Sequence, residues 1–361
     1  MLFLSNADVM EVLDIQLTIS ALRIGYDDLR RGEAAFIPRI DLWAATGRDY
    51  DYHQWGSMTG VCQSFETVAV RIKSDIHSWE GGVQSKYSSK PGLFSGIILL
   101  YSTTDGAPYA LIQDGFLQHL RVGGSAGLGT ELLAREDASV VGMLGSGGMA
   151  RTYLQAIAEI RDLSRVKVYS PTEANRNRYA QEMSEQLGID VIPVDTPEAA
   201  IRESDIVTTA TDSMSPTFDA NWVSPGAHVN ILTRRELSPS LLSRCNRIIQ
   251  LGDVSVPFGA TIPGMEWSAG NVGSFVSGSP EDRARIPQAK VAETGSYPTM
   301  LQVQQGLAEG RTSADDITLF VNTGTQGVQF SSVGAATYRA ARERGLGTEF
   351  PTEWFLEDIR N

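Results

Sequence analysis

The sequence is poor in cysteine and in positive charge. Its two cysteines, Cys62 and Cys245, lie far apart in a chain of 361 residues, which argues against a disulfide framework and fits a reducing compartment. The formal net charge of −13 repels polyphosphate backbones, so we expect no nucleic-acid partner. The four histidines and two cysteines show no zinc-type spacing, and we expect no metal site.

Long hydrophobic runs are also lacking. The longest uninterrupted stretches, such as "IILLY" at 97–101, are far shorter than a membrane span. The N-terminal segment turns acidic at once and lacks the basic start and long apolar core of a secretory signal. We therefore expect no membrane association and a cytoplasmic location. The length exceeds one ordinary core and predicts two domains.

The order of apolar patterns separates these two domains. From Ala34 to Asp114, short β-like runs broken by Gly, Pro and Asp-Gly predict a mostly antiparallel sheet, preceded by a helix. From 139 to 252, strands and helices alternate, which predicts a doubly wound parallel sheet of the Rossmann type. A helix is predicted near 327–345, and the glycine-rich passage 259–280 is predicted to be loop.

The segment "VVGMLGSGGMARTYLQAI" at 140–157 contains the pattern G-x-G-x-x-A. It follows a predicted strand and opens a predicted helix, which is the context of a dinucleotide-binding turn. Gly145 would permit the turn, Gly147 would let the backbone approach a pyrophosphate, and Ala150 would allow close helix–strand packing. The alternative is a turn that only connects two elements. The residues of this turn predicted to bind cofactor are Gly145, Ser146, Gly147, Gly148, Met149 and Ala150.

The residues after the next strand bear on the choice of cofactor. An NAD enzyme usually has an acidic residue there, whereas this chain has "SPT" at 170–172 and then Arg176 and Arg178. Hydroxyls with a nearby guanidinium suit a 2′-phosphate, so NADP(H) is favoured over NAD(H). The alternative is that both arginines belong to a solvated helix face. The further residues predicted to bind the cofactor are Ser170, Thr172, Arg176, Thr209, Ala210 and Thr211.

Several segments, in order over nearly the whole chain, resemble the ornithine cyclodeaminase and mu-crystallin family. They include "LSNADVMEVL", "DGAPYALIQDGFLQHLRVGGSAGLGTELLAR", "GSGGMARTYLQAI", "ESDIVTTATDS" and "RERGLGTEF". The resemblance implies a Rossmann-type NAD(P)-binding domain over 121–319. It also implies a discontinuous α+β domain, formed by 1–120 and 320–361, that binds substrate and makes a homodimer.

The resemblance also implies substrate-binding residues. The arginine of "FIPRI" is Arg39, the arginine of "LQHLRVGG" is Arg121, and the strand lysine is Lys73, with Lys86 as the alternative. In the resemblance the arginines hold a substrate carboxylate and the lysine interacts with the amino or imino centre. Guanidinium groups bind carboxylates in a bidentate way, and a lysine of lowered pKa can exchange a proton. The alternative for each is a surface or strand-edge charge.

The chain departs from the cyclodeaminase pattern in its acidic residues. The segment "HVNILTRREL" is short and has no aspartate, and Phe330 follows Gln329 where the family has an aspartate near "GVQ". Without these acids, the resemblance still implies hydride exchange between a nicotinamide and a carbon–nitrogen bond next to a carboxylate. We therefore expect an NAD(P)H-dependent reductase of imino acids or ketimines, or the reverse amino-acid dehydrogenase. The alternatives are an ornithine cyclodeaminase that forms proline, and a mu-crystallin-like protein that binds NADPH and a small ligand.

Overall fold

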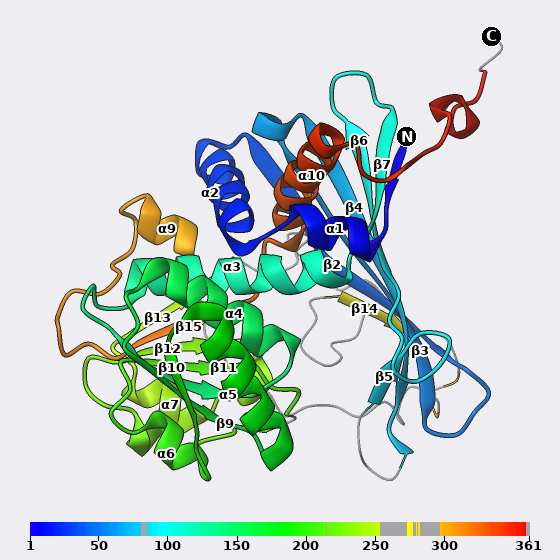
Figure 1. Cartoon of the computed structure of the whole chain (residues 1–361). Coiled ribbons are helices and arrows are strands. Elements are labelled where there is room, and N and C mark those ends of the chain that lie inside the picture. The colour runs from blue at the N-terminus through cyan, green and yellow to red at the C-terminus, as the bar shows by residue number, and fades with distance from the viewer. Residues whose placement is uncertain are drawn as a thin grey trace. The chain divides into compact units, whose positions relative to one another are not determined.

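The computed structural model describes residues 1–80, 85–213, 215–252, 279, 281 and 297–358, and the backbone of 273–276. The chain forms two compact units. Of the described residues, the first unit contains 1–118, 273–276, 279, 281 and 325–358, and the second contains 119–252 and 297–324. Both units are coloured along the chain in Figure 1.

The first unit is built on a nine-stranded mixed sheet. Its central strands β2, β3, β4, β6 and β7 pair in antiparallel fashion, which confirms the predicted antiparallel sheet. The strand order is β14-β2-β3-β4-β6-β7-β1-β16, with β5 paired to β4. The strands are β1 (Leu2–Leu4), β2 (Ala34–Ala45), β3 (Asp51–Cys62), β4 (Thr67–Ser78), β5 (Ser85–Tyr87), β6 (Gly96–Ser102), β7 (Pro108–Gln113), β14 (Gly273–Val276) and β16 (Thr348–Glu349).

In the described part of the first unit, three α-helices accompany this sheet. They are α1 (Asn6–Val12), α2 (Ile15–Arg31) and α10 (Gln326–Arg344). Asp14 caps α2 by accepting a hydrogen bond from the Leu17 amide, and Gly32 ends the helix in the left-handed conformation. The predicted helix near 327–345 is confirmed by α10, which packs against α2, β3 and β4. Figure 1 shows α2 and α10 lying along the sheet.

One strand comes from an unexpected part of the chain. Residues 273–276 form β14, which pairs parallel to β2 at Ile40–Trp43. The sequence predicts loop there, and the resemblance implies that the segment belongs to the nucleotide-binding domain. The rest of the passage 259–280 lies outside the described residues, apart from Ser279.

The second unit contains a seven-stranded parallel sheet, as the alternation of strands and helices predicts. The strand order is β10-β9-β8-β11-β12-β15-β13. Its strands are β8 (Val140–Leu144), β9 (Arg165–Tyr169), β10 (Asp190–Pro193), β11 (Ile206–Thr209), β12 (His228–Ile231), β13 (Arg247–Gln250) and β15 (Thr318–Val321). Its helices are α4 (Gly148–Ile160), α5 (Glu173–Leu187), α6 (Pro197–Ile201), α7 (Pro239–Arg244) and α9 (Met300–Gln304).

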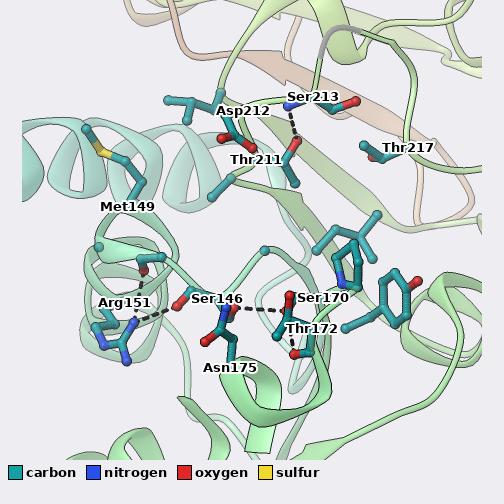
Figure 2. A pocket seen from close by; sticks show the side chains of 18 of the residues that line it. Ser146, Met149, Arg151, Ser170, Thr172, Asn175, Thr211, Asp212, Ser213 and Thr217 are labelled. Carbon is teal, nitrogen blue, oxygen red and sulfur yellow. Dashed lines mark hydrogen bonds between the residues drawn. The ribbon is translucent and has the colours of Figure 1, made fainter. Parts of the chain in front are cut away.

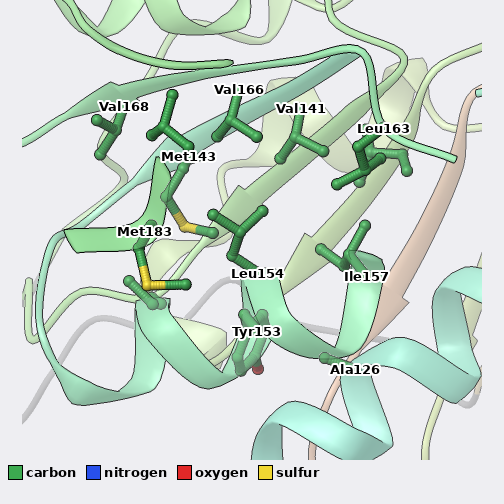
Figure 3. Packing of buried hydrophobic residues seen from close by; sticks show 14 of the residues in the cluster. Ala126, Val141, Met143, Tyr153, Leu154, Ile157, Leu163, Val166, Val168 and Met183 are labelled. Atoms are coloured by element: carbon green, nitrogen blue, oxygen red, sulfur yellow. The ribbon is translucent and has the colours of Figure 1, made fainter. Parts of the chain in front are cut away.

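The order places β8 and β11 side by side, although β9 and β10 separate them in the chain. Here the strand order changes direction, and ligands bind at this point in open α/β sheets, beyond the carboxyl ends of the strands. One side of β8 and β9 is sealed by α4 and α5 through a buried cluster that includes Met143, Val166, Leu154 and Met183 (Figure 3). Fully burying an aliphatic side chain contributes about 1.5–3 kcal/mol, so this cluster fixes the start of α4 firmly.

Helix α3 (Gly115–Leu133) runs from the first unit into the second. Its small residues allow close packing within the second unit, as their abundance suggests. A Cβ on Gly123 would lie 2.4 Å from the Thr152 carbonyl oxygen of α4. Asn230 and Asn322 each donate a hydrogen bond to an α3 carbonyl, at Ala126 and Val122 respectively, both at 3.0 Å.

Candidate functional site

The glycine turn between β8 and α4 has the geometry of an anion site. Gly145 has φ +113°, which favours glycine, and a Cβ there would lie 2.4 Å from the Ala210 carbonyl oxygen. A Cβ on Gly147 would meet no atom within 4 Å, so open space adjoins this backbone. Helix α4 begins at Gly148 without a side-chain cap. The amide groups of its first turn are therefore available to an anion.

A cavity of about 1040 Å³ opens beside this turn. It is bounded on one side by the glycine turn and the end of β9, and on another by the segment after β11. Figure 2 shows Ser146, Ser170, Thr172 and Asn175 on one side and Thr211, Asp212 and Ser213 on the other. The predicted cofactor residues that line it are Gly145, Ser146, Gly147, Gly148, Met149, Ser170, Thr172, Ala210 and Thr211.

Three predicted cofactor residues do not line the cavity. Ala150 is fully buried in the core beneath α4, in keeping with its predicted packing role. Thr209 is fully buried at the end of β11. Arg176 is buried with its guanidinium bonded to the Ser170 carbonyl oxygen (3.3 Å) and to Asp195 Oδ1 (2.7 Å).

The end of β9 is rich in hydroxyl groups. The Ser146 and Ser170 hydroxyls are 3.0 Å apart and part of the cavity wall. Asn175 and Arg178, from the first two turns of α5, also line the cavity. The lining residues at this end include no carboxylate. Of the two arginines of α5, Arg178 contributes its side chain to the cavity wall, whereas Arg176 is bonded to Asp195.

Two basic groups at the cavity, Arg151 and His119, are not among the predicted cofactor residues. Arg151 donates to the Ser146 carbonyl oxygen (2.6 Å), is bonded to Glu182, and stacks over the Tyr179 ring at 5.3 Å. His119 also lines the cavity, and a Cβ on Gly148 would lie 3.0 Å from its ring. Arg151 directly follows the G-x-G-x-x-A pattern, so its position in the sequence could have indicated that it lies near the turn.

The segment after β11 is held by a buried acid. The Glu236 side chain is almost fully buried, and its Oε1 accepts from the Thr211 hydroxyl at 2.6 Å. Burial raises the pKa of Glu236, while hydrogen bonds from Thr211 and Thr209 lower it. Because Thr211 lines the cavity, Glu236 fixes one of the cavity walls.

The first unit contains a cluster of paired charges that includes two predicted substrate residues. Lys73 Nζ donates to Gln54 Oε1 at 2.6 Å and to Asp75 Oδ2 at 2.7 Å. Burial, and to a smaller extent Arg39, lower the pKa of Lys73 to about 7. Lys86, the alternative lysine, lies exposed on the short strand β5. Of the two lysines, Lys73 is therefore the one that is buried and whose pKa lies near neutrality.

Arg39 joins the same cluster through Asp41. Its Nε donates to Asp41 Oδ1 at 2.8 Å, and Asp41 Oδ2 accepts from Gln54 Nε2 at 3.0 Å. The register of β2 against β3 shifts between Ile37 and Ile40, and such a bulge redirects a side chain. Within the described residues the terminal nitrogens of Arg39 have no partner. They can therefore bind a carboxylate.

A second ion pair adjoins this cluster and was not predicted. Arg71 is buried, donates from Nε to Asp114 Oδ2 at 2.6 Å, and lies 5.5 Å from the centre of the Phe330 ring. Asp114 immediately precedes α3, and its carbonyl oxygen accepts from the Gln118 amide. The pair joins residues 43 positions apart, so no local pattern could have revealed it.

Arg121, the third predicted substrate residue, is buried in α3 and belongs to the second unit. Burial raises the pKa of the Tyr153 hydroxyl, and the positive charge of Arg121 lowers it to a smaller extent. Arg39 and Lys73 belong to the first unit. The structure thus brings Arg39 and Lys73 into one cluster and places Arg121 on the helix that leads into the nucleotide-binding unit.

In the part of the chain that the structure describes, no three His, Cys, Asp or Glu side chains are grouped so that they could hold a metal ion. No helix among the described residues is long and apolar enough to cross a membrane. Cys62 and Cys245 are free thiols, and burial raises the pKa of both.

The parallel sheet, the glycine turn and the adjoining cavity define a protein with a dinucleotide-binding α/β unit. The model of the ornithine cyclodeaminase/mu-crystallin family matches residues 86–338, and the chain belongs to this family. This confirms the resemblance seen in the sequence.

Three known proteins illustrate the relationship. The Δ1-pyrroline-2-carboxylate reductase of Bacillus cereus is 26% identical over 306 residues, covering 81% of this chain and 83% of that protein. The Thermococcus litoralis Δ1-pyrroline-2-carboxylate reductase, solved with NADH and L-proline, has a TM-score of 0.75 at 24% identity, covering 97% of this chain and 100% of that one. The iminosuccinate reductase of Paracoccus denitrificans, solved with NAD⁺, has a TM-score of 0.73 at 18% identity, covering 96% and 98%.

Proposed function

We propose that this chain is an NAD(P)H-dependent reductase of imino acids, cyclic or linear, which also catalyses the reverse oxidation of the amino acid. The observation that carries the proposal is the cluster in which Lys73, with a pKa of about 7, is linked to Arg39 through Gln54 and Asp41. The names of the relatives support it, since two of the three are pyrroline-2-carboxylate reductases and the third is an iminosuccinate reductase.

The two ends of an imino acid match this cluster. The terminal nitrogens of Arg39 bind the carboxylate in a bidentate way. Lys73 donates a proton to the imine nitrogen in reduction and accepts it in oxidation, and a pKa near neutrality suits both directions. Arg121 is proposed as a second carboxylate ligand from the family resemblance. The main contribution to the rate is the positioning of the imine.

The cavity of the second unit is proposed to hold the cofactor. The amides at the start of α4 would bind the pyrophosphate, and Ala210 and Thr211, which line the cavity after β11, would face the nicotinamide end. When bound, a reduced nicotinamide supplies the hydride for the imine carbon. Ser170, Thr172, Asn175 and Arg178 form an end without a carboxylate, so NADP(H) is the proposed cofactor. NAD(H) is the alternative, since two structural relatives were solved with NADH or NAD⁺.

The loop after β12 argues against a cyclodeaminase. Its acidic residue, Glu236, is buried and is bonded to Thr211. Arg234 in the same loop donates to Gln250 Oε1 at 3.0 Å. In the described part of this loop, no exposed carboxylate is present to manage the proton transfers of ammonia release and ring closure. Reduction needs one proton donor, and Lys73 provides it.

We propose that the chain forms a homodimer through the open face of the first unit's sheet. The helices α2 and α10 pack on one face, while the other face carries apolar side chains. Ile72 and Ile97 are directly paired on that face, as are Val70 and Leu99. Ile37, Leu42 and Ile97 are 52%, 46% and 38% exposed, which marks an interaction surface. We propose that a second copy of this chain covers it.

The proposed function is tested by a substrate screen. Purified protein is mixed with NADPH or NADH and with Δ1-pyrroline-2-carboxylate, its six-membered homologue, iminosuccinate, or pyruvate with ammonia. Loss of reduced cofactor together with formation of the amino acid is the expected result. Proline and ammonia formed from ornithine without net cofactor change would identify a cyclodeaminase instead. Tight NADPH binding without turnover of any imine would identify a binding protein.

A further inference from the structure

The side chain of Lys73 is held at two points. Gln54 Oε1 and Asp75 Oδ2 accept from its Nζ at 2.6 and 2.7 Å. An ammonium group has three N–H bonds and no acceptor. Among the described residues no third acceptor is present, and 11% of the side chain remains exposed. Two N–H bonds are therefore fixed, and the direction of the third is determined by them.

Gln54 is itself held in one orientation. Its Nε2 donates to Asp41 Oδ2, and its Oε1 accepts from Lys73. A flipped amide would place its oxygen against the Asp41 carboxylate and its N–H groups against the Lys73 ammonium, and neither contact is a hydrogen bond. Gln54 and Asp41 are 2% and 0% exposed, so water cannot readily replace either partner. The other oxygen of Asp41 is bonded to Arg39. The proposed carboxylate ligand and the proposed proton donor thus belong to one hydrogen-bonded chain.

The surrounding charges act on Lys73 with opposite signs. Burial lowers its pKa most, followed by the positive charge of Arg39, while Asp75 raises the pKa and Lys86 lowers it. Asp75 is bonded to Lys73, whereas Lys86 lies exposed on β5, which pairs with β4. Among the described residues, the charged or titratable groups near Lys73 on this face of the sheet are Arg39 and Asp41 on β2, Tyr52 on β3, Arg71, Asp75 and His77 on β4, Lys86 on β5, and Asp114 after β7.

We propose that Asp75 and Gln54 are positioning residues that orient Lys73 so that its third N–H faces the imine nitrogen, and that the negative charge of Asp75 favours the protonated form of Lys73. This inference rests on the proposed imine reduction. The lone pair of the imine nitrogen takes the proton from Lys73, the carbon receives hydride from a reduced nicotinamide, and the C=N π pair becomes the amine lone pair. Lys73 is left neutral and is reprotonated by water.

The pH dependence of kcat/KM tests the inference. Reduction requires protonated Lys73, so its rate falls above the pKa of Lys73. Asp75→Asn removes a negative charge and shifts this alkaline limb to lower pH by about one unit or more. Lys86→Gln, a surface change, removes a positive charge and shifts the limb to higher pH. Gln54→Met keeps the side-chain length and lowers kcat about tenfold at little change in KM, because orientation rather than binding is lost.

A second readout does not depend on activity. The chain has only five lysines, Lys73, Lys86, Lys90, Lys167 and Lys290, so ¹⁵N-lysine NMR of the whole protein resolves their titrations. Lys73 is assigned by the signal lost in Lys73→Met. We expect its pKa to be lower in Asp75→Asn and higher in Lys86→Gln.

The outcomes separate this inference from the proposed function. If the wild type reduces imines but neither variant moves the alkaline limb or the Lys73 titration, the inference is overturned and the function stands. If the wild type reduces no imine, the proposed function fails, and the inference fails with it.

Discussion

Replacing Gly147 or Gly145 by alanine separates cofactor binding from folding at one turn. A methyl group at Gly147 meets no protein atom within 4 Å and fills only the space beside the amides of α4. A methyl group at Gly145 lies 2.4 Å from the Ala210 carbonyl oxygen on a backbone with φ +113°. We therefore expect Gly147→Ala to lose cofactor affinity at unchanged stability, and Gly145→Ala to lose stability.

The sizes of both effects follow from these contacts. Displacing a pyrophosphate by the size of a methyl group costs at least one charge-assisted hydrogen bond, about 1.5–3 kcal/mol. This corresponds to a roughly 10- to 150-fold higher Kd for Gly147→Ala. Backbone strain at Gly145 costs about 1–3 kcal/mol. For a unit of this size, that lowers the Tm by roughly 2–10 °C.

The assay pairs a fluorescence titration with NADPH and a thermal melt of the apo protein, both on wild type and the two variants. An unchanged Kd for Gly147→Ala would show that no pyrophosphate lies against this backbone. Equal losses of Tm in the two variants would show that the space beside Gly147 is not open.

Three further predictions concern other residues. Lys73→Met lowers kcat/KM for imine reduction by a factor of about 10²–10⁴ and leaves the NADPH affinity unchanged, whereas Lys86→Gln retains activity at neutral pH. Steady-state kinetics in which Lys86→Gln, and not Lys73→Met, loses activity would contradict this assignment. Arg178→Gln raises the Kd for NADPH about tenfold and leaves the Kd for NADH unchanged. Arg176→Gln breaks the bond to Asp195, so it lowers the Tm without changing the cofactor preference. Equal Kd values for the two variants would refute this assignment. Ile97→Asp places a charge on the open sheet face, and we expect it to convert the proposed dimer to a monomer in analytical ultracentrifugation. A dimer of unchanged mass would place the interface elsewhere.

The local features of the site could be predicted from sequence. The turn at Gly145 and Gly147 depends on neighbouring residues and on the strand and helix that flank it. The alternation of strands and helices likewise predicts the parallel sheet, because it reflects local burial. These features need no knowledge of distant contacts.

The cluster around Lys73 could not be predicted in the same way. Gln54, Asp75 and Asp41 come from three strands, and only their register brings the side chains together. The choice between Lys73 and Lys86 likewise depends on burial, because Lys86 lies on a short exposed strand.

The two arginines of α5 illustrate the same difficulty on a helix. Arg176 and Arg178 are two residues apart and therefore point in different directions. The sequence does not show that Asp195 holds Arg176 while Arg178 lines the cavity. The strand β14 was missed because its partner, β2, lies more than two hundred residues earlier.

The most direct test of the account follows the hydride itself. The protein is incubated with an imino acid that it turns over and with nicotinamide cofactor carrying deuterium at both C4 positions, and the amino acid is analysed by mass spectrometry and NMR. The account predicts one deuterium at the carbon next to the carboxylate. Amino acid formed without deuterium at that carbon would contradict it.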